Sequence, residues 1–124
     1  MTRFLTVLIA AAALPACSPE YDHVELELYS SPPIPVWVSG TDIEIPAGLA
    51  VAVEVEPIAR SRIEYVPDDE VELESEDRAI LRVDATENSR RFVFVGVEPG
   101  ETCVVVTVLG DREDCIPARV TATP

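Results

Sequence analysis

Short stretches in which apolar and charged residues alternate run through most of this chain, and they constrain its fold more than any other feature. Three valines alternate with alanine and glutamate in 51–56, and the segments 24–28 and 71–74 show the same two-residue period. A period of two places successive side chains on opposite faces of a β-strand, whereas an amphipathic helix needs a period near 3.6. No segment beyond residue 16 has a helical period, so the pattern predicts an all-β domain.

Turn residues divide these stretches into short strands. Pro67–Asp68–Asp69 and Gly110–Asp111 are two such breaks, and Pro99–Gly100 fits a type II turn in which the glycine takes a positive φ. Strands are expected at 23–29, 36–38, 43–45, 49–56, 62–66, 70–75, 79–84, 91–97, 102–108 and 115–121. Short strands at this spacing, with no helices between them, predict a β-sandwich.

Charge and scarce residue types limit the functions that remain. The chain has 124 residues, enough for one domain, with 23 acidic and 9 basic side chains and a formal net charge of −14. So acidic a chain lacks the basic footprint that binds phosphate backbones, and we expect no nucleic-acid partner. The single histidine, His23, leaves no histidine metal cluster. We expect a non-enzymatic domain that has no catalytic residue and no cofactor.

The first sixteen residues are organised like an export signal. Arg3 gives a positive start, 4–14 is an apolar run, and Leu14–Pro15–Ala16 leads directly to Cys17. The run suits a signal-peptide core and is too short to span a bilayer of about 30 Å as a helix. This end resembles the lipobox of bacterial lipoproteins, although Pro15 departs from the small residue usual at its position. An ordinary signal peptide followed by a chance cysteine is the alternative.

The lipobox resemblance implies a location and a domain organisation. Residues 1–16 would be a signal helix, 17–22 a short linker that begins with lipidated Cys17, and 23–124 the folded domain. Acyl chains contribute about 0.8 kcal/mol per buried CH₂, so several of them hold a protein firmly at a membrane. Ser18 is not the aspartate that favours inner-membrane retention in Gram-negative lipoproteins. The implied location is the bacterial outer membrane, with the membrane and an unidentified envelope protein or glycan as partners.

Three further segments carry a second, looser set of motifs. Residues 74–84 read ESEDRAILRVD, 97–102 read VEPGET, and 46–48 read PAG ahead of a long alternating strand. Together they resemble bacterial immunoglobulin-like domains of group 2, although the usual tryptophan before the serine segment is absent and Leu73 lies near its place. The resemblance implies an immunoglobulin-like β-sandwich of two antiparallel sheets, used as a structural or protein-interaction module.

Cys103 and Cys115 are the two cysteines other than Cys17. In 102–108 one face carries Val104, Val106 and Val108, and the other carries Cys103 with Val105 and Thr107. In 115–121 one face carries Ile116, Ala118 and Val120, and the other carries Cys115 with Arg119. If both apolar faces pack inward, both cysteines point outward, and a hairpin near Gly110 brings them opposite each other. We expect a disulfide, which persists in an oxidising envelope. Two free thiols are the alternative.

Seven of the ten residues in 68–77 are acidic, and this run has two interpretations. Alternation with Val71 and Leu73 indicates the solvated face of a strand. Clustered carboxylates are also the ligands that Ca²⁺ prefers, which makes Asp68, Asp69 and Glu70 weak candidates for a cation site.

Trp37 follows the proline-rich segment 31–35 and also has two interpretations. A lone tryptophan in a small sandwich usually fills the core, whereas an exposed one contacts sugars or peptides through its flat apolar ring. An exposed Trp37 in a concavity would favour the alternative function, a carbohydrate- or cation-binding lipoprotein.

Overall fold

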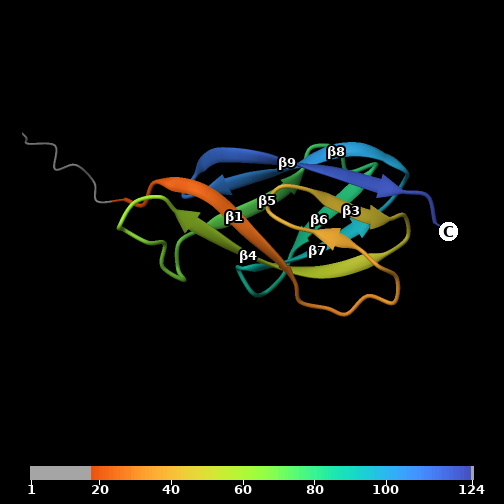
Figure 1. The fold of residues 1–124 in the computed structure, drawn as a ribbon, viewed down its shortest axis with the longest axis horizontal. Helices are drawn as coiled ribbons and strands as arrows, with labels where there is room; N and C mark the ends of the chain where they lie inside the picture. Colours follow the sequence, from red (N-terminus) through yellow and green to blue (C-terminus); the bar gives the residue numbers. More distant parts are fainter. Residues whose placement is uncertain (1–17, 124) are drawn as a thin grey trace, which may run out of the picture.

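The computed structural model describes residues 18–123, which form nine β-strands in two layers (Figure 1). The strands are β1 (Tyr21–Leu28), β2 (Trp37–Val38), β3 (Ile43–Pro46), β4 (Ala50–Ala59), β5 (Val71–Ser75), β6 (Leu81–Ala85), β7 (Arg91–Gly96), β8 (Gly100–Val108) and β9 (Asp111–Thr121). Within 18–123 no helix is long and apolar enough to cross a membrane. The expected signal helix at 1–16 and Cys17 lie outside the described residues.

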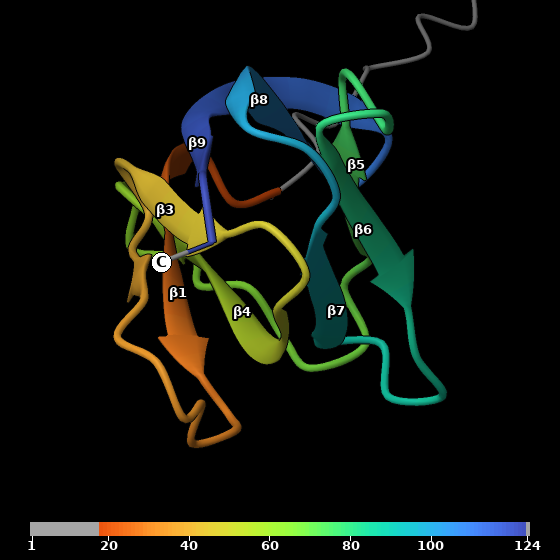
Figure 2. The ribbon, with the colours of Figure 1, turned by 90° about the vertical axis from the view of Figure 1, so that its right-hand side faces the viewer.

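The strands divide into a first sheet, in the order β1-β4-β7-β6, and a second sheet, in the order β2-β3-β9-β8-β5. Figure 2 shows β3, β8 and β9 in one layer and β1, β4 and β7 in the other. The sandwich is confirmed, but the expectation of two antiparallel sheets is wrong for the second one. There β3 runs parallel to β9, with Ile43 paired to Ala118. After β3 the chain crosses to β4 in the first sheet. Because no hairpin connects β3 to β9, the two strands are free to run in the same direction.

The core lies between the sheets and is built from the inward positions of the alternating strands. Val51, Val53 and Val55 of β4 face the second sheet, while the glutamates between and after them face solvent. Phe94 of the central strand β7 is completely buried and is the largest such side chain in the described residues. Burial of this kind contributes about 25 cal/mol per Å² of apolar surface, which fixes the strand faces.

One expected strand is absent, and several strands begin or end at other residues than expected. The structure has no strand at 62–66, where the chain crosses from β4 in the first sheet to β5 in the second. Ile63 and Val66 are exposed there, and Tyr65 alone of the apolar residues in this segment packs against the core. β1 begins at Tyr21, two residues before the expected start. The Arg60 guanidinium donates hydrogen bonds to the backbone carbonyl of Tyr21 at 2.8 and 3.0 Å.

Gly100 does not have the backbone conformation expected of it. Gly48 and Gly110 are the glycines with positive φ among the described residues, so the Pro99–Gly100 pair does not form a type II turn. Gly100 instead begins β8, and a Cβ at this position would lie 2.9 Å from the Ile80 side chain. The absence of a side chain allows close packing here.

The hairpin between β8 and β9 contains one unfavourable residue. Leu109 has a φ of 52° and Gly110 a φ of 83°, the two positive values that a two-residue type I′ turn requires. Asparagine tolerates this left-handed region better than leucine, whose Cβ crowds the backbone. We expect Leu109→Asn to raise the free energy of unfolding by about 1 kcal/mol, measured by urea unfolding. Leu109→Val is the control: a β-branched residue there should lower stability.

Candidate functional site

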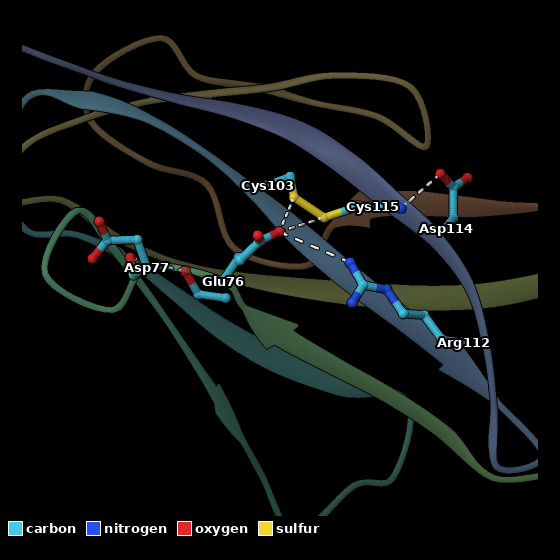
Figure 3. The surroundings of a disulfide bond; sticks show 7 residues. Glu76, Asp77, Cys103, Arg112, Asp114 and Cys115 are labelled. Atoms are coloured by element: carbon cyan, nitrogen blue, oxygen red, sulfur yellow. Dashed lines mark hydrogen bonds and ion pairs between the residues drawn. A yellow bond between two sulfur atoms is a disulfide. The ribbon is translucent and has the colours of Figure 1, made fainter.

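The predicted disulfide is present between β8 and β9. Cys103 and Cys115 are bonded, with their Cα atoms 5.4 Å apart, and both side chains lie on the outer face of the second sheet (Figure 3). Val104 and Ile116, the next residues along each strand, are buried in the core. The alternation of apolar residues therefore predicted the direction of both cysteines correctly.

The register of this hairpin differs from the expected one. Cys103 pairs with Pro117 and Cys115 with Val105, so the cysteines are diagonal neighbours and not directly opposite. The register shifts between Val106 and Thr107, where Glu113 is an extra residue in β9. Without such a bulge, a one-residue offset would put Cys115 and Cys103 on opposite faces. With the bulge, Cys115 can bond to Cys103 on the outer face while Ile116, Ala118 and Val120 of β9 remain in the core.

A carboxylate lies against the disulfide. Glu76, directly after β5, has Oε2 2.8 Å from Sγ of Cys103 and 3.3 Å from Sγ of Cys115 (Figure 3). Its backbone N–H donates to the Cys103 carbonyl at 3.0 Å, which fixes Glu76 beside the hairpin. The guanidinium of Arg112 lies beside it, with Nη2 3.9 Å from the same Oε2. Sequence reasoning missed Glu76, because its contact joins segments 27 residues apart.

Trp37 lies on the outside of the sandwich. Trp37 is 61% exposed, so it does not fill the core. β2 is a two-residue edge strand, and its inward position is taken by Val38, which packs against the core. Trp37 pairs with Glu44, which pairs with Arg119, which pairs with Glu101. Because paired residues share a face, these four side chains form a row across the second sheet.

Two concavities flank the middle of this row. One, of about 290 Å³, is lined by Trp37 together with Pro35, Val36, Glu44, Pro46 and Thr121. The other, of about 490 Å³, is lined by Thr41, Asp42, Ile43, Glu44, Glu101, Thr102, Pro117, Ala118 and Arg119. Glu44 lines both, so the two are neighbours on one surface. We call this surface, from Trp37 to Glu101, the Trp37 face.

The Trp37 face offers donors and acceptors beside its aromatic ring. Arg119 donates from Nη2 and Nε to Oε1 of Glu101, at 2.9 and 3.2 Å, and leaves other guanidinium and carboxylate positions open to solvent. Asp42 and Thr41 belong to the turn before β3, where their backbone N–H groups donate to Oγ of Ser39. This combination of a flat ring, hydroxyls and charged groups resembles what sugar-binding surfaces use.

The structure does not bring the weak cation candidates together. Asp69 accepts a hydrogen bond from the Val66 N–H at 2.8 Å and so closes its own turn. The ligand atoms of Asp68, Asp69 and Glu70 form no convergent group in residues 18–123. Along β5 the acidic side chains point to solvent, as the alternation indicated. Glu70 raises the pKa of the Glu72 carboxyl by hydrogen bonding and like charge.

His23 lies on the solvent side of β1. Its Nδ1 is 2.6 Å from Oδ2 of Asp22, and this hydrogen bond raises the pKa of His23 above its usual value. On the same strand, burial raises the pKa of Tyr21, whose hydroxyl donates to Asp114 at 3.5 Å. Nε2 of His23 also lies 3.7 Å from Oε1 of Glu25 on the same strand. Both His23 and Tyr21 are structural surface contacts of β1.

Like charges face each other across β1 and β4. Glu25 is paired directly with Glu56, an arrangement that destabilises a sheet. We expect Glu56→Arg to raise the free energy of unfolding by about 0.5 kcal/mol at low salt, because it creates an opposite-charge pair. Glu98→Arg is the matched control, since it changes the net charge equally at an exposed position between β7 and β8, outside the strand pairs. Equal effects of the two changes in urea unfolding would contradict the cross-strand explanation.

Comparisons with known proteins show the fold alone. No family model matches the chain, and no curated protein matches it. Domains 4 and 5 of the S-layer protein SbsC superpose with a TM-score of 0.54 at 17% identity, over 74% of this chain and 54% of that one. Surface layer protein SbsC domains 1–6 and 4–9 give 0.59 and 0.57 at 14% and 15% identity, over 86% of this chain. The chain covers 14% and 15% of those two structures.

Proposed function

We propose that this chain is a lipid-anchored, non-enzymatic module of a bacterial cell envelope with a structural or protein-interaction role. The observation that carries the proposal is its two-sheet sandwich, a fold shared with domains of a surface layer protein. Acidic side chains on the described strands alternate with core residues and face solvent. This arrangement supports a surface that binds neighbours, and its charge favours basic or cation-bridged ones.

The positions of the chain ends support anchoring at one end of the sandwich. The start of β1 and the C-terminus lie at opposite ends of the long axis (Figure 1). Cys17 precedes β1 by four residues, which reach at most about 14 Å when extended. A lipid on Cys17 would hold the β1 end at the membrane and direct the C-terminal end away from it.

Cys17→Ser tests the anchor. We expect this variant to accumulate as an unprocessed precursor or to leave the membrane fraction, whereas the wild type is labelled by a fatty acid and needs detergent for extraction. Ser18→Asp leaves Cys17 intact and should shift the protein from the outer to the inner membrane of a Gram-negative host. A processed, detergent-dependent Cys17→Ser protein would contradict the proposal. Crosslinking in the native envelope would then identify the partner of the correctly anchored form.

Carbohydrate binding is the second candidate function, and the exposed Trp37 beside a concavity favours it. Thr121, near the C-terminus, lines the same concavity, so the Trp37 face lies toward the end away from the proposed anchor. A pyranose stacked on Trp37 would place hydroxyls near Glu44 and Arg119. A flat aromatic ring buries a large apolar area at small entropic cost.

Because Trp37 is the single tryptophan of the chain, its fluorescence reports on this surface directly. Titration with peptidoglycan fragments and envelope oligosaccharides should shift its emission, and Trp37→Ala should weaken binding at least tenfold in calorimetry. Tyr29→Ala is the control, since Tyr29 is 57% exposed but follows β1 of the first sheet, where the Arg91 guanidinium lies over its ring. Unchanged emission across the glycan set would rule out this second function.

A further inference from the structure

Three potential metal ligands converge at the disulfide. In the part of the chain that the structure describes, the ligand atoms of Glu76, Cys103 and Cys115 all lie within 4.8 Å of one another. They come from three neighbouring segments: the residue directly after β5, β8 and β9 (Figure 3). The cysteines are half-buried and the Glu76 side chain is 60% exposed, so an ion can reach the group from solvent.

The contact of Glu76 with the sulfur atoms lacks a donor in the oxidised protein. Disulfide sulfurs carry no proton, so the distances of 2.8 and 3.3 Å are not hydrogen bonds in this state. Nη2 of Arg112 lies 3.9 Å from Oε2 of Glu76, and the Arg112 side chain is 64% exposed. The positive charge of Arg112 therefore offsets the negative charge of Glu76 only weakly. In the reduced protein, two thiolates beside this carboxylate would repel one another unless a cation joined them.

We propose that reduction of the Cys103–Cys115 disulfide opens a zinc site made of the two thiolates and the Glu76 carboxylate. A dithiol reductant breaks the S–S bond: it gives up two electrons and two protons, becomes a disulfide itself, and leaves two thiols. Zn²⁺ then replaces the two thiol protons, which are released to solvent. No other electron transfer is needed, because the oxidation state of zinc does not change.

The ligand set selects zinc over harder cations. Thiolates bind Zn²⁺ at about 2.3 Å and carboxylates at about 2.0–2.2 Å, so two sulfurs on one zinc are about 3.8 Å apart. The Cα atoms of Cys103 and Cys115 lie 5.4 Å apart, so β8 and β9 already hold the two sulfurs close enough for that span. Ca²⁺ and Mg²⁺ prefer oxygen ligands and gain nothing from the thiolates. Three protein ligands leave the fourth tetrahedral position to water.

Zinc binding by the full chain carrying Cys17→Ser tests the site, since Cys103 and Cys115 are then the only thiols. After reduction with a dithiol and its removal under anaerobic conditions, competition with a chromophoric chelator should give one zinc per chain. We expect Glu76→Gln to weaken zinc binding at least tenfold, and Cys103→Ala to weaken it at least a hundredfold. Glu74→Gln removes the same charge from the same outer face, opposite Val105, and should change the affinity less than threefold.

Thermal unfolding provides a second readout. Zinc should raise the Tm of the reduced protein and leave that of the oxidised protein unchanged, because the metal replaces the lost cross-link between β8 and β9. Equal effects on both forms would show that zinc binds the acidic surface elsewhere and would overturn the proposal. Equal zinc affinity of the reduced wild type and Glu76→Gln would also overturn it.

Discussion

Phe94→Ala is expected to lower the free energy of unfolding by about 3–5 kcal/mol, the largest effect of any single truncation in this domain. Phe94 is fully buried in β7 and pairs with Val51 on one side and Val83 on the other. Its removal leaves a cavity in a core made mainly of valines, whose short branched side chains cannot move to fill it. Urea unfolding should show a lower midpoint with an unchanged m-value.

Val93→Ala is the matched control for this experiment. Val93 precedes Phe94 on the same strand but lies on the outer, half-buried face of the first sheet. Its truncation removes less buried surface and should cost about 1 kcal/mol or less. Similar losses for the two variants would show that the alternation does not separate a core face from an outer face in β7.

The strand faces were predictable because each depends on a local two-residue period. Val51, Val53 and Val55 alternate with residues that point outward, and burial follows that order. The outward direction of Cys103 and Cys115 followed from the same argument. These properties need no knowledge of which strands are neighbours, so a single sequence suffices to predict them.

Three of the missed features depend on contacts between segments that are separated in the sequence. The parallel pairing of β3 with β9 joins Ile43 to Ala118, and no local pattern encodes the direction of such a neighbour. The place of Glu76 beside the disulfide depends on how the end of β5 meets β8. The expected type II turn at Gly100 was wrong for a related reason. Position 100 needs a glycine because the Ile80 side chain packs where a Cβ would lie.

Trp37 shows a limit of reasoning from residue type. A bulky aromatic side chain favours the core on average, but β2 has only two residues and Val38 already takes its inward position. The parity of a strand that short cannot be derived from its own sequence. The pairing of Trp37 with Glu44 places its side chain on the outer face of the second sheet.

Removal of the disulfide is expected to have the second large effect on stability. The bridge joins residues twelve positions apart, and closing a loop of this size stabilises a protein by about 3 kcal/mol through the lost entropy of its unfolded chain. The double variant Cys103→Ala/Cys115→Ala should therefore unfold at a much lower urea concentration. Its folded state should persist, because Val104, Val106 and Val108 still pack into the core.

The reduced wild type separates the bond from the side chains in this test. If the cross-link supplies the stability, the metal-free reduced protein and the double variant should unfold at nearly the same urea concentration. A loss below about 1 kcal/mol in both would mean that the hairpin is already restrained in the unfolded chain. A large loss in the variant alone would instead assign the effect to packing of the sulfur atoms against the outer face of the sheet.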